Sequence, residues 1–97
     1  MEDSLLTFLR KNFNVVDMET LPGSIDQTPE YEDKVIDDFE NTVIAKGATS
    51  IVLYGETELM SVYALTDDVT IQTLLAAAKD DTDVIDTINN FVEVYTI

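Results

Sequence analysis

Acidic side chains are the residues of this chain most able to do chemistry, and they are unevenly spread. The chain of 97 residues holds 20 acidic and 5 basic residues, which gives a formal net charge of −15. Nine of the acids fall between residues 17 and 40, where Lys34 is the only base. Carboxylates can bind cations, transfer protons in catalysis, or present negative charge to a basic partner.

The residue types that are missing favour the last of these three roles. The chain has no His, so the commonest general base and metal ligand is absent, and no Cys, so thiol nucleophiles, disulfides and zinc–thiolate sites are excluded. The Asp-rich segment 80–86 does not fit an EF-hand, because counting from Asp81 puts Asp86 at the Gly position and Val92 at the bidentate Glu position. We therefore expect a non-enzymatic protein that needs no cofactor and no metal.

Four acids of the 17–40 segment are predicted to share one side of a helix. At 100° per residue, Glu30, Asp33, Asp37 and Glu40 fall within an arc of about 80°, away from the apolar positions. They span about 15 Å of helix axis, or roughly 5 Å per step. One DNA strand places a phosphate about every 3.4 Å of axis, which is within side-chain reach of that spacing. These four residues are the predicted partner contacts.

The preceding segment supplies a second tier of predicted contacts, namely Asp17, Glu19 and Asp26. A folded chain of this mass exposes about 5,500 Å², so evenly spread acids would average about one per 280 Å². A DNA duplex carries one charge per roughly 110 Å². Nucleic-acid mimicry therefore requires the acids to crowd onto one face, with the second helix joined by the 17–26 segment or by the acids of residues 80–86. The alternative is an ordinary solvated helix face.

The first half of the chain predicts two helices. Residues 3–13 have apolar side chains at helical spacing, and residues 15–19 read as a short extended segment. The composition of residues 20–29 indicates a loop. A second helix is predicted to begin at Pro29, after the capping residue Thr28, and to end before Gly47.

The second half predicts a β-hairpin followed by two helices. Residues 49–54 and 57–65 are rich in β-branched and aromatic residues, and Gly55-Glu56 suits a type II′ turn between them. Apolar side chains on both faces indicate that the hairpin is covered on both sides. A lone hairpin is marginal, so it needs helices, a third strand or another copy.

Two amphipathic patterns follow the hairpin. Residues 68–79 predict a helix capped by Thr66, Asp67 or Asp68, and residues 82–90 predict another with Thr82 as its cap. Residues 91–97 fit either a continuation of that helix or a strand. The prediction is a single α+β domain over residues 1–97, with two N-terminal helices, a hairpin, two C-terminal helices and a possible short C-terminal strand.

Charge and hydropathy also limit where the protein acts and what it binds. No apolar stretch approaches the ~20 residues of a membrane span, and the N-terminus lacks the pattern of a secretory signal. We expect a cytoplasmic protein, in the host cytoplasm if it is viral. A strongly negative surface is repelled by DNA, RNA and anionic membranes, so the expected partner is a basic protein surface.

These inferences lead to a functional prediction of an acidic inhibitor that occupies the basic groove of a nucleic-acid-processing enzyme. In size and acidity the chain resembles small phage-type DNA mimics that block restriction, repair or CRISPR nucleases, and immunity proteins that neutralise toxic nucleases. The likeness is one of physical type and is not carried by a sequence motif. The alternative is an assembly or adaptor protein that docks a partner, or itself as a homodimer, through the hairpin edge or an apolar helix face.

Overall fold

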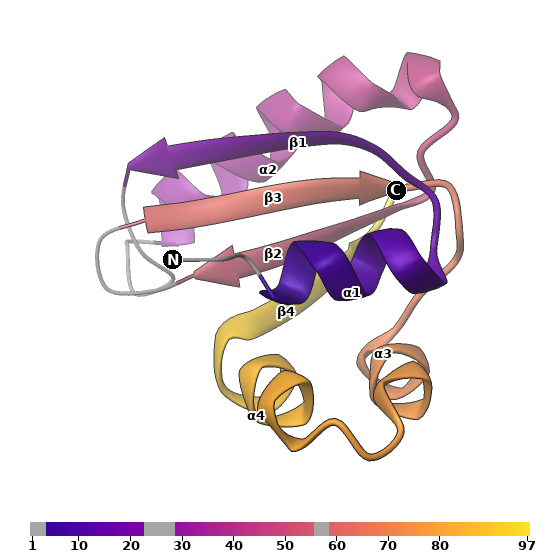
Figure 1. The fold of residues 1–97 in the computed structure, drawn as a ribbon. Coiled ribbons are helices and arrows are strands. Elements are labelled where there is room, and N and C mark those ends of the chain that lie inside the picture. The colour runs from indigo at the N-terminus through magenta and orange to yellow at the C-terminus, as the bar shows by residue number, and fades with distance from the viewer. Residues whose placement is uncertain (1–3, 23–28, 56–58) are drawn as a thin grey trace.

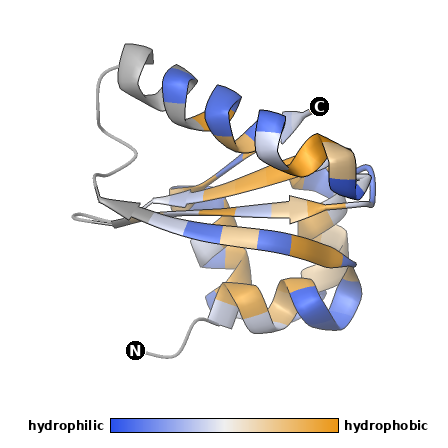
Figure 2. Cartoon of the chain, turned by 90° about the horizontal axis from the view of Figure 1, so that it is seen from above, coloured by the Kyte–Doolittle hydropathy of each residue, from blue (hydrophilic) through white to orange (hydrophobic). Residues whose placement is uncertain are grey.

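The fold has three layers, with a β-sheet between one helix and three others. The computed structural model describes residues 4–22, 29–55 and 59–97, and within these ranges it leaves out the side chains of residues 21–22, 29–33, 35 and 59. Helix α2 (Pro29–Val43) covers one face of the sheet. Helices α1 (Ser4–Asn12), α3 (Ile71–Ala78) and α4 (Thr82–Phe91) lie on the other face (Figures 1 and 2).

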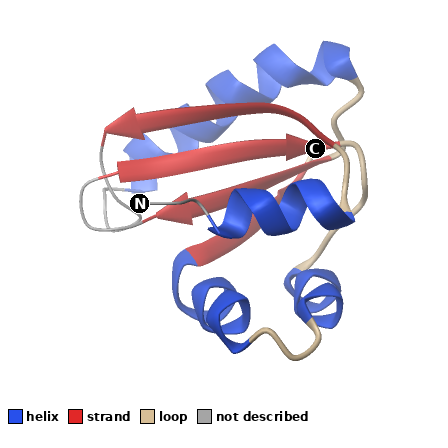
Figure 3. Cartoon of the chain, viewed as in Figure 1, coloured by secondary structure: helices blue, strands red, loops and turns tan. Residues whose placement is uncertain are grey.

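The sheet has four antiparallel strands in the order β1-β3-β2-β4 (Figure 3). Their bounds are Val15–Pro22 for β1, Ser50–Gly55 for β2, Leu59–Leu65 for β3 and Val92–Thr96 for β4. The predicted hairpin forms the two central strands, and β1 and β4 flank it. The α+β class and the covering of both hairpin faces are therefore confirmed.

Two apolar cores explain why both faces of the hairpin are hydrophobic. On one face Ile36, Phe39 and Val43 of α2 pack over β2 and β3, at Ile51, Leu53, Met60, Val62 and Ala64. On the other face Val52, Tyr63 and Leu65 meet side chains from α1, α3 and α4. Alternate residues of each central strand serve the two cores, as the two-residue period of a strand requires.

The predicted ends of two strands, β1 and β2, are wrong, because both strands continue past the predicted last residue. The predicted loop starts at residue 20, but Thr20 to Pro22 continue β1 and pair with β3. Proline is tolerated there because β1 is an edge strand. The register pairs Gly55 with Met60, so Gly55 lies within β2 and a two-residue turn at Gly55-Glu56 is excluded. The connecting residues 56–58 lie outside the described residues.

The starts of the last two helices also differ from prediction. Helix α3 is capped by Thr70, whose side chain accepts a hydrogen bond from the Thr73 N–H, and not by residues 66–68. The chain bends at residues 66–67 and becomes helical only after Thr70, because Val69 is buried and its N–H donates to Ser50 Oγ. Helix α4 is capped by Asp81, which accepts from the Val84 N–H, and not by Thr82.

The ends of α2 and α4 confirm one prediction and resolve an ambiguity. After Val43 the chain makes a 3-10 turn, η1 (Ile44–Lys46), and Gly47 ends it with a φ of +84°, as the predicted glycine stop requires. Residues 92–96 form β4, because pairing with β2 outweighs the helical pattern that continues past residue 91.

Candidate anionic binding surface

The acids of β1 lie on the same side of the sheet as α2. Asp17 is paired with Ala64, and Glu19 with Val62. Both partners belong to the core beneath α2. Directly opposite residues of an antiparallel pair project to the same face, so Asp17 and Glu19 project toward the α2 side. The first of the two predicted combinations, the second helix with the acids that precede it, is the one that the fold permits.

Helix α2 itself carries the central group of predicted contacts. Asp37 and Asp38 are exposed and Glu40 is half-buried. Asp37 and Glu40 are three residues apart and therefore lie on the same side of the helix. Glu30 and Asp33 are also residues of α2, but their side chains lie outside the described part of the structure, and Asp26 lies outside it altogether.

One acid on this side was missed in the sequence. Glu93 is paired with Leu53, which lies in the core beneath α2, so Glu93 also projects toward the α2 side. Its carboxylate accepts a hydrogen bond of 2.8 Å from the Tyr95 hydroxyl. Only the assignment of β4 as a strand could have located it. We call the described acids on this side the α2 surface; they are Asp17, Glu19, Asp37, Asp38, Glu40 and Glu93.

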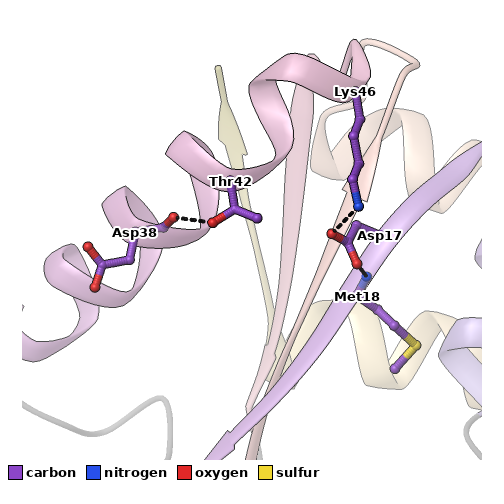
Figure 4. Close-up of polar contacts among 5 residues, drawn as sticks. All are labelled: Asp17, Met18, Asp38, Thr42 and Lys46. Carbon is purple, nitrogen blue, oxygen red and sulfur yellow. Dashed lines mark hydrogen bonds and ion pairs between the residues drawn. The ribbon is translucent and has the colours of Figure 1, made fainter.

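Two lysines neutralise part of the α2 surface. Lys34 Nζ lies 2.9 Å from Asp38 Oδ2, the pair that the i,i+4 spacing predicts, and this contact raises the pKa of Lys34. Lys46 Nζ lies 2.8 Å from Asp17 Oδ2 (Figure 4). The Lys46 hydrogen bond, followed by one from the Met18 N–H, lowers the pKa of Asp17. Asp17 therefore fastens the end of the α2 layer to β1, and is less free to contact a partner than predicted.

The acids of residues 80–86 lie elsewhere. Asp80, Asp81, Asp83 and Asp86 belong to α4 or to the turn before it, in the layer across the sheet from α2 (Figure 1). The second predicted combination is therefore wrong. With Asp67 and Asp68 of the segment that leads into α3, six described acids lie outside the α2 surface, so the described carboxylates do not gather on one side of the molecule.

The α2 surface and the rest of the molecule differ in whether their Lys and Arg side chains form ion pairs. The α2 surface has six acids and two lysines, a net charge of −4 among the described residues, and both lysines are paired. The other six described acids lie outside this surface, as do Arg10, Lys11 and Lys79, which gives these residues a net charge of −3. Lys11 and Lys79 line a pocket of about 370 Å³ between α1 and the turn before α4. The contrast in net charge is small, but the α2 surface is the side without an unpaired described cation.

Within the described ranges, no three His, Cys, Asp or Glu residues are grouped so as to hold a metal ion. No described helix combines the length and apolarity that a membrane crossing needs.

Comparison with protein-family models, curated proteins and solved structures gave no match. The α2 surface can act through its charge, and its carboxylates are suited to bind basic groups.

Proposed function

We propose that this chain is an acidic binding protein whose α2 surface occupies the basic groove of a nucleic-acid-processing enzyme and inhibits it. The observation that carries the proposal is that Glu19 of β1 projects to the side covered by α2, where Asp37 and Glu40 are exposed or half-buried. Acids separated by about twenty residues in sequence thus lie on the same side of the sheet. The action is proposed to take place in the cytoplasm, or in the host cytoplasm if the protein is viral.

The α2 surface suits a nucleic-acid groove in the sign of its charge, and the proposal rests on this surface alone, because the described acids are divided equally between it and the rest of the molecule. Such grooves are lined with Lys and Arg that neutralise a row of phosphates. Successive acids on one side of a helix are about 5 Å apart along its axis, against about 3.4 Å for the phosphates of one DNA strand, a difference within the reach of side chains. A net charge of −15 on the whole chain also steers it toward basic partners and speeds association.

The proposal is tested by capturing partners from the native cell at low salt with the chain as bait. The expected partner is a nucleic-acid-binding enzyme that is released by duplex DNA, because bait and DNA compete for one groove. A second bait carries Asp37→Lys and Glu40→Lys, and is expected to lose this partner. A partner that duplex DNA does not displace from the bait contradicts the proposal.

A matched control separates the α2 surface from general acidity. Asp80→Lys with Asp86→Lys makes the same change in net charge on the opposite side of the sheet, at two exposed positions. This bait is expected to retain the partner with only a modest loss. Equal loss from both double variants would mean that total charge, and not the α2 surface, sets the interaction.

Of the two docking surfaces predicted for the alternative adaptor function, the hairpin edge is not free. The outer edges of the hairpin are occupied, because β1 pairs with β3 and β4 pairs with β2. The large apolar residues exposed in the described ranges are Ile44, at 58%, and Phe91, at 41%. They lie apart, since Ile44 follows α2 and Phe91 packs on Tyr54 in the opposite layer. They do not form a continuous apolar helix face.

A further inference from the structure

The two edges of the sheet differ in how many backbone groups they leave unpaired. In the ladder between β2 and β4, the Ile97 N–H donates to the Thr49 carbonyl. Antiparallel strands alternate their backbone groups, so Glu93, Tyr95 and Ile97 point toward β2. Val92, Val94 and Thr96 therefore point away from the sheet. The Val92 N–H closes the last turn of α4, because Val92 is the C-cap of that helix. For the other outward N–H and C=O groups, no partner is found among the residues that the structure describes.

The edge at β1 is blocked by its own residues. The same alternation, carried across β2 and β3, directs Met18, Thr20 and Pro22 outward. The Met18 N–H is already bonded to Asp17 Oδ1 at 2.8 Å, as Figure 4 shows. Pro22 has no N–H to offer, and the register of β1 shifts between Val15 and Asp17. Bulges, prolines and edge charges are devices that prevent a strand from pairing with another chain.

The edge at β4 has no bulge and no proline, and it carries a single charge. It is paired regularly with β2 over all five residues, without a bulge, and its sequence VEVYT contains no Pro and no Lys. Its one charged residue, Glu93, projects to the α2 side and accepts a hydrogen bond from Tyr95. An unprotected edge of this kind is a template for a further strand.

We propose that β4 pairs with β4 of a second copy of this chain, antiparallel about a two-fold axis at Val94. The outward residues are symmetric about that point, so Val94 faces Val94 of the second copy and Val92 faces Thr96. The facing pairs supply four backbone hydrogen bonds, two between the Val94 residues and two from Thr96 N–H to the Val92 carbonyl, because the Val92 N–H of each copy is used by α4. The non-bonded positions between them place Glu93 opposite Tyr95 of the second copy, so no two carboxylates of β4 face each other directly. The product is a continuous eight-stranded sheet.

The β4 edge is complementary to itself, so a second copy of the same chain can pair with it. An isologous contact requires a surface that is complementary to itself, and the pattern of donors and acceptors at Val92, Val94 and Thr96 satisfies that condition. Two bodies of charge −15 repel each other, so the dimer is expected to strengthen with added salt. Binding of a basic partner to the α2 surface is expected to weaken with salt, so the two interactions are separable.

The test is sedimentation of the intact chain from micromolar to near-millimolar concentration, with the variants Thr96→Pro and Thr96→Ala. Thr96 is exposed and its N–H points outward, so proline removes two of the four intermolecular bonds and leaves the β2–β4 ladder intact. The native chain and Thr96→Ala are expected to dimerise, and Thr96→Pro to dimerise at least about tenfold more weakly. A native chain that stays monomeric, or a Thr96→Pro chain that dimerises as well as the native one, overturns the proposal.

A second measurement needs no substitution. Amide hydrogen exchange at Val94 and Thr96 is expected to slow as the native chain is concentrated, while exchange at Thr20, an outward residue of β1, is unchanged. Slowing at Thr20 instead would place the contact at the β1 edge and overturn the proposal. Protection of Val94 and Thr96 that appears only when an extended peptide is added would also overturn it, because the edge would then accept a different strand.

Discussion

Lys46 Nζ lies 2.8 Å from Asp17 Oδ2, and this ion pair joins the turn after α2 to the edge strand β1. The two residues are 29 positions apart in sequence. Asp17 Oδ1 also accepts a hydrogen bond from the Met18 N–H. One carboxylate therefore connects two layers of the fold and caps an outward group of the sheet edge.

This ion pair is expected to make a small contribution to stability. The Asp17 side chain is 26% exposed and that of Lys46 is 50% exposed, so water screens the charges. A double-mutant cycle of Asp17→Ala and Lys46→Met, measured by urea unfolding, should give a coupling of about 0.5 kcal/mol at low salt. A coupling that is absent at low salt, or that does not decline with added salt, would contradict this assignment.

The same carboxylate makes stability depend on acid pH. The pKa of Asp17 is lowered from its ordinary value of 3.8, chiefly by the Lys46 hydrogen bond. A lowered pKa in the folded state means that the contribution of Asp17 is present above the unfolded value and is lost as the pH falls toward the folded one. The difference in the free energy of unfolding between the native chain and Asp17→Asn should be constant at neutral pH and shrink below about pH 4. A constant difference down to the acid limit would contradict the shift.

Ser50 is expected to matter more for stability than its size suggests. Its side chain is 1% exposed, and its Oγ accepts a hydrogen bond from the buried Val69 N–H. Ser50→Ala leaves this N–H buried without a partner, which should cost about 1–3 kcal/mol. Thr70 follows Val69 and caps α3, so Thr70→Ala removes this cap and should lower the free energy of unfolding by about 1 kcal/mol. It serves as a comparison. Thermal unfolding should show a larger loss of stability for Ser50→Ala than for Thr70→Ala. An unchanged melting temperature for Ser50→Ala would refute the predicted role of Ser50.

Local patterns predicted the features that depend on neighbours in sequence. The span of α2 and its end at Gly47 follow from Pro29, a periodic apolar face and a glycine stop. The hairpin follows from two runs of β-branched residues that carry apolar side chains on both faces. In each case the residues that determine the structure lie within one element or at its ends. Their local pattern is therefore enough to predict that element.

Long-range pairing decided the features that were missed. Residues 92–96 satisfy a helical pattern, and they form β4 because β2, about forty residues earlier, offers a free edge. The full length of β1 likewise depends on β3. Because register determines which acids share a face, the position of Glu93 and the separation of residues 80–86 from α2 could not be read from spacing. The ion pair of Asp17 with Lys46 required the same three-dimensional information.

The central claim, that the α2 surface binds a basic groove, is tested most directly by measuring the affinity of the captured enzyme at several salt concentrations. The native chain, the Asp37→Lys/Glu40→Lys variant and the Asp80→Lys/Asp86→Lys control are compared at equal ionic strength. We predict that reversal on α2 weakens binding at least about a hundredfold and flattens the salt dependence, while the control keeps most of the affinity. Affinity that is unchanged by reversal on α2, or that does not fall as salt rises, would contradict the claim.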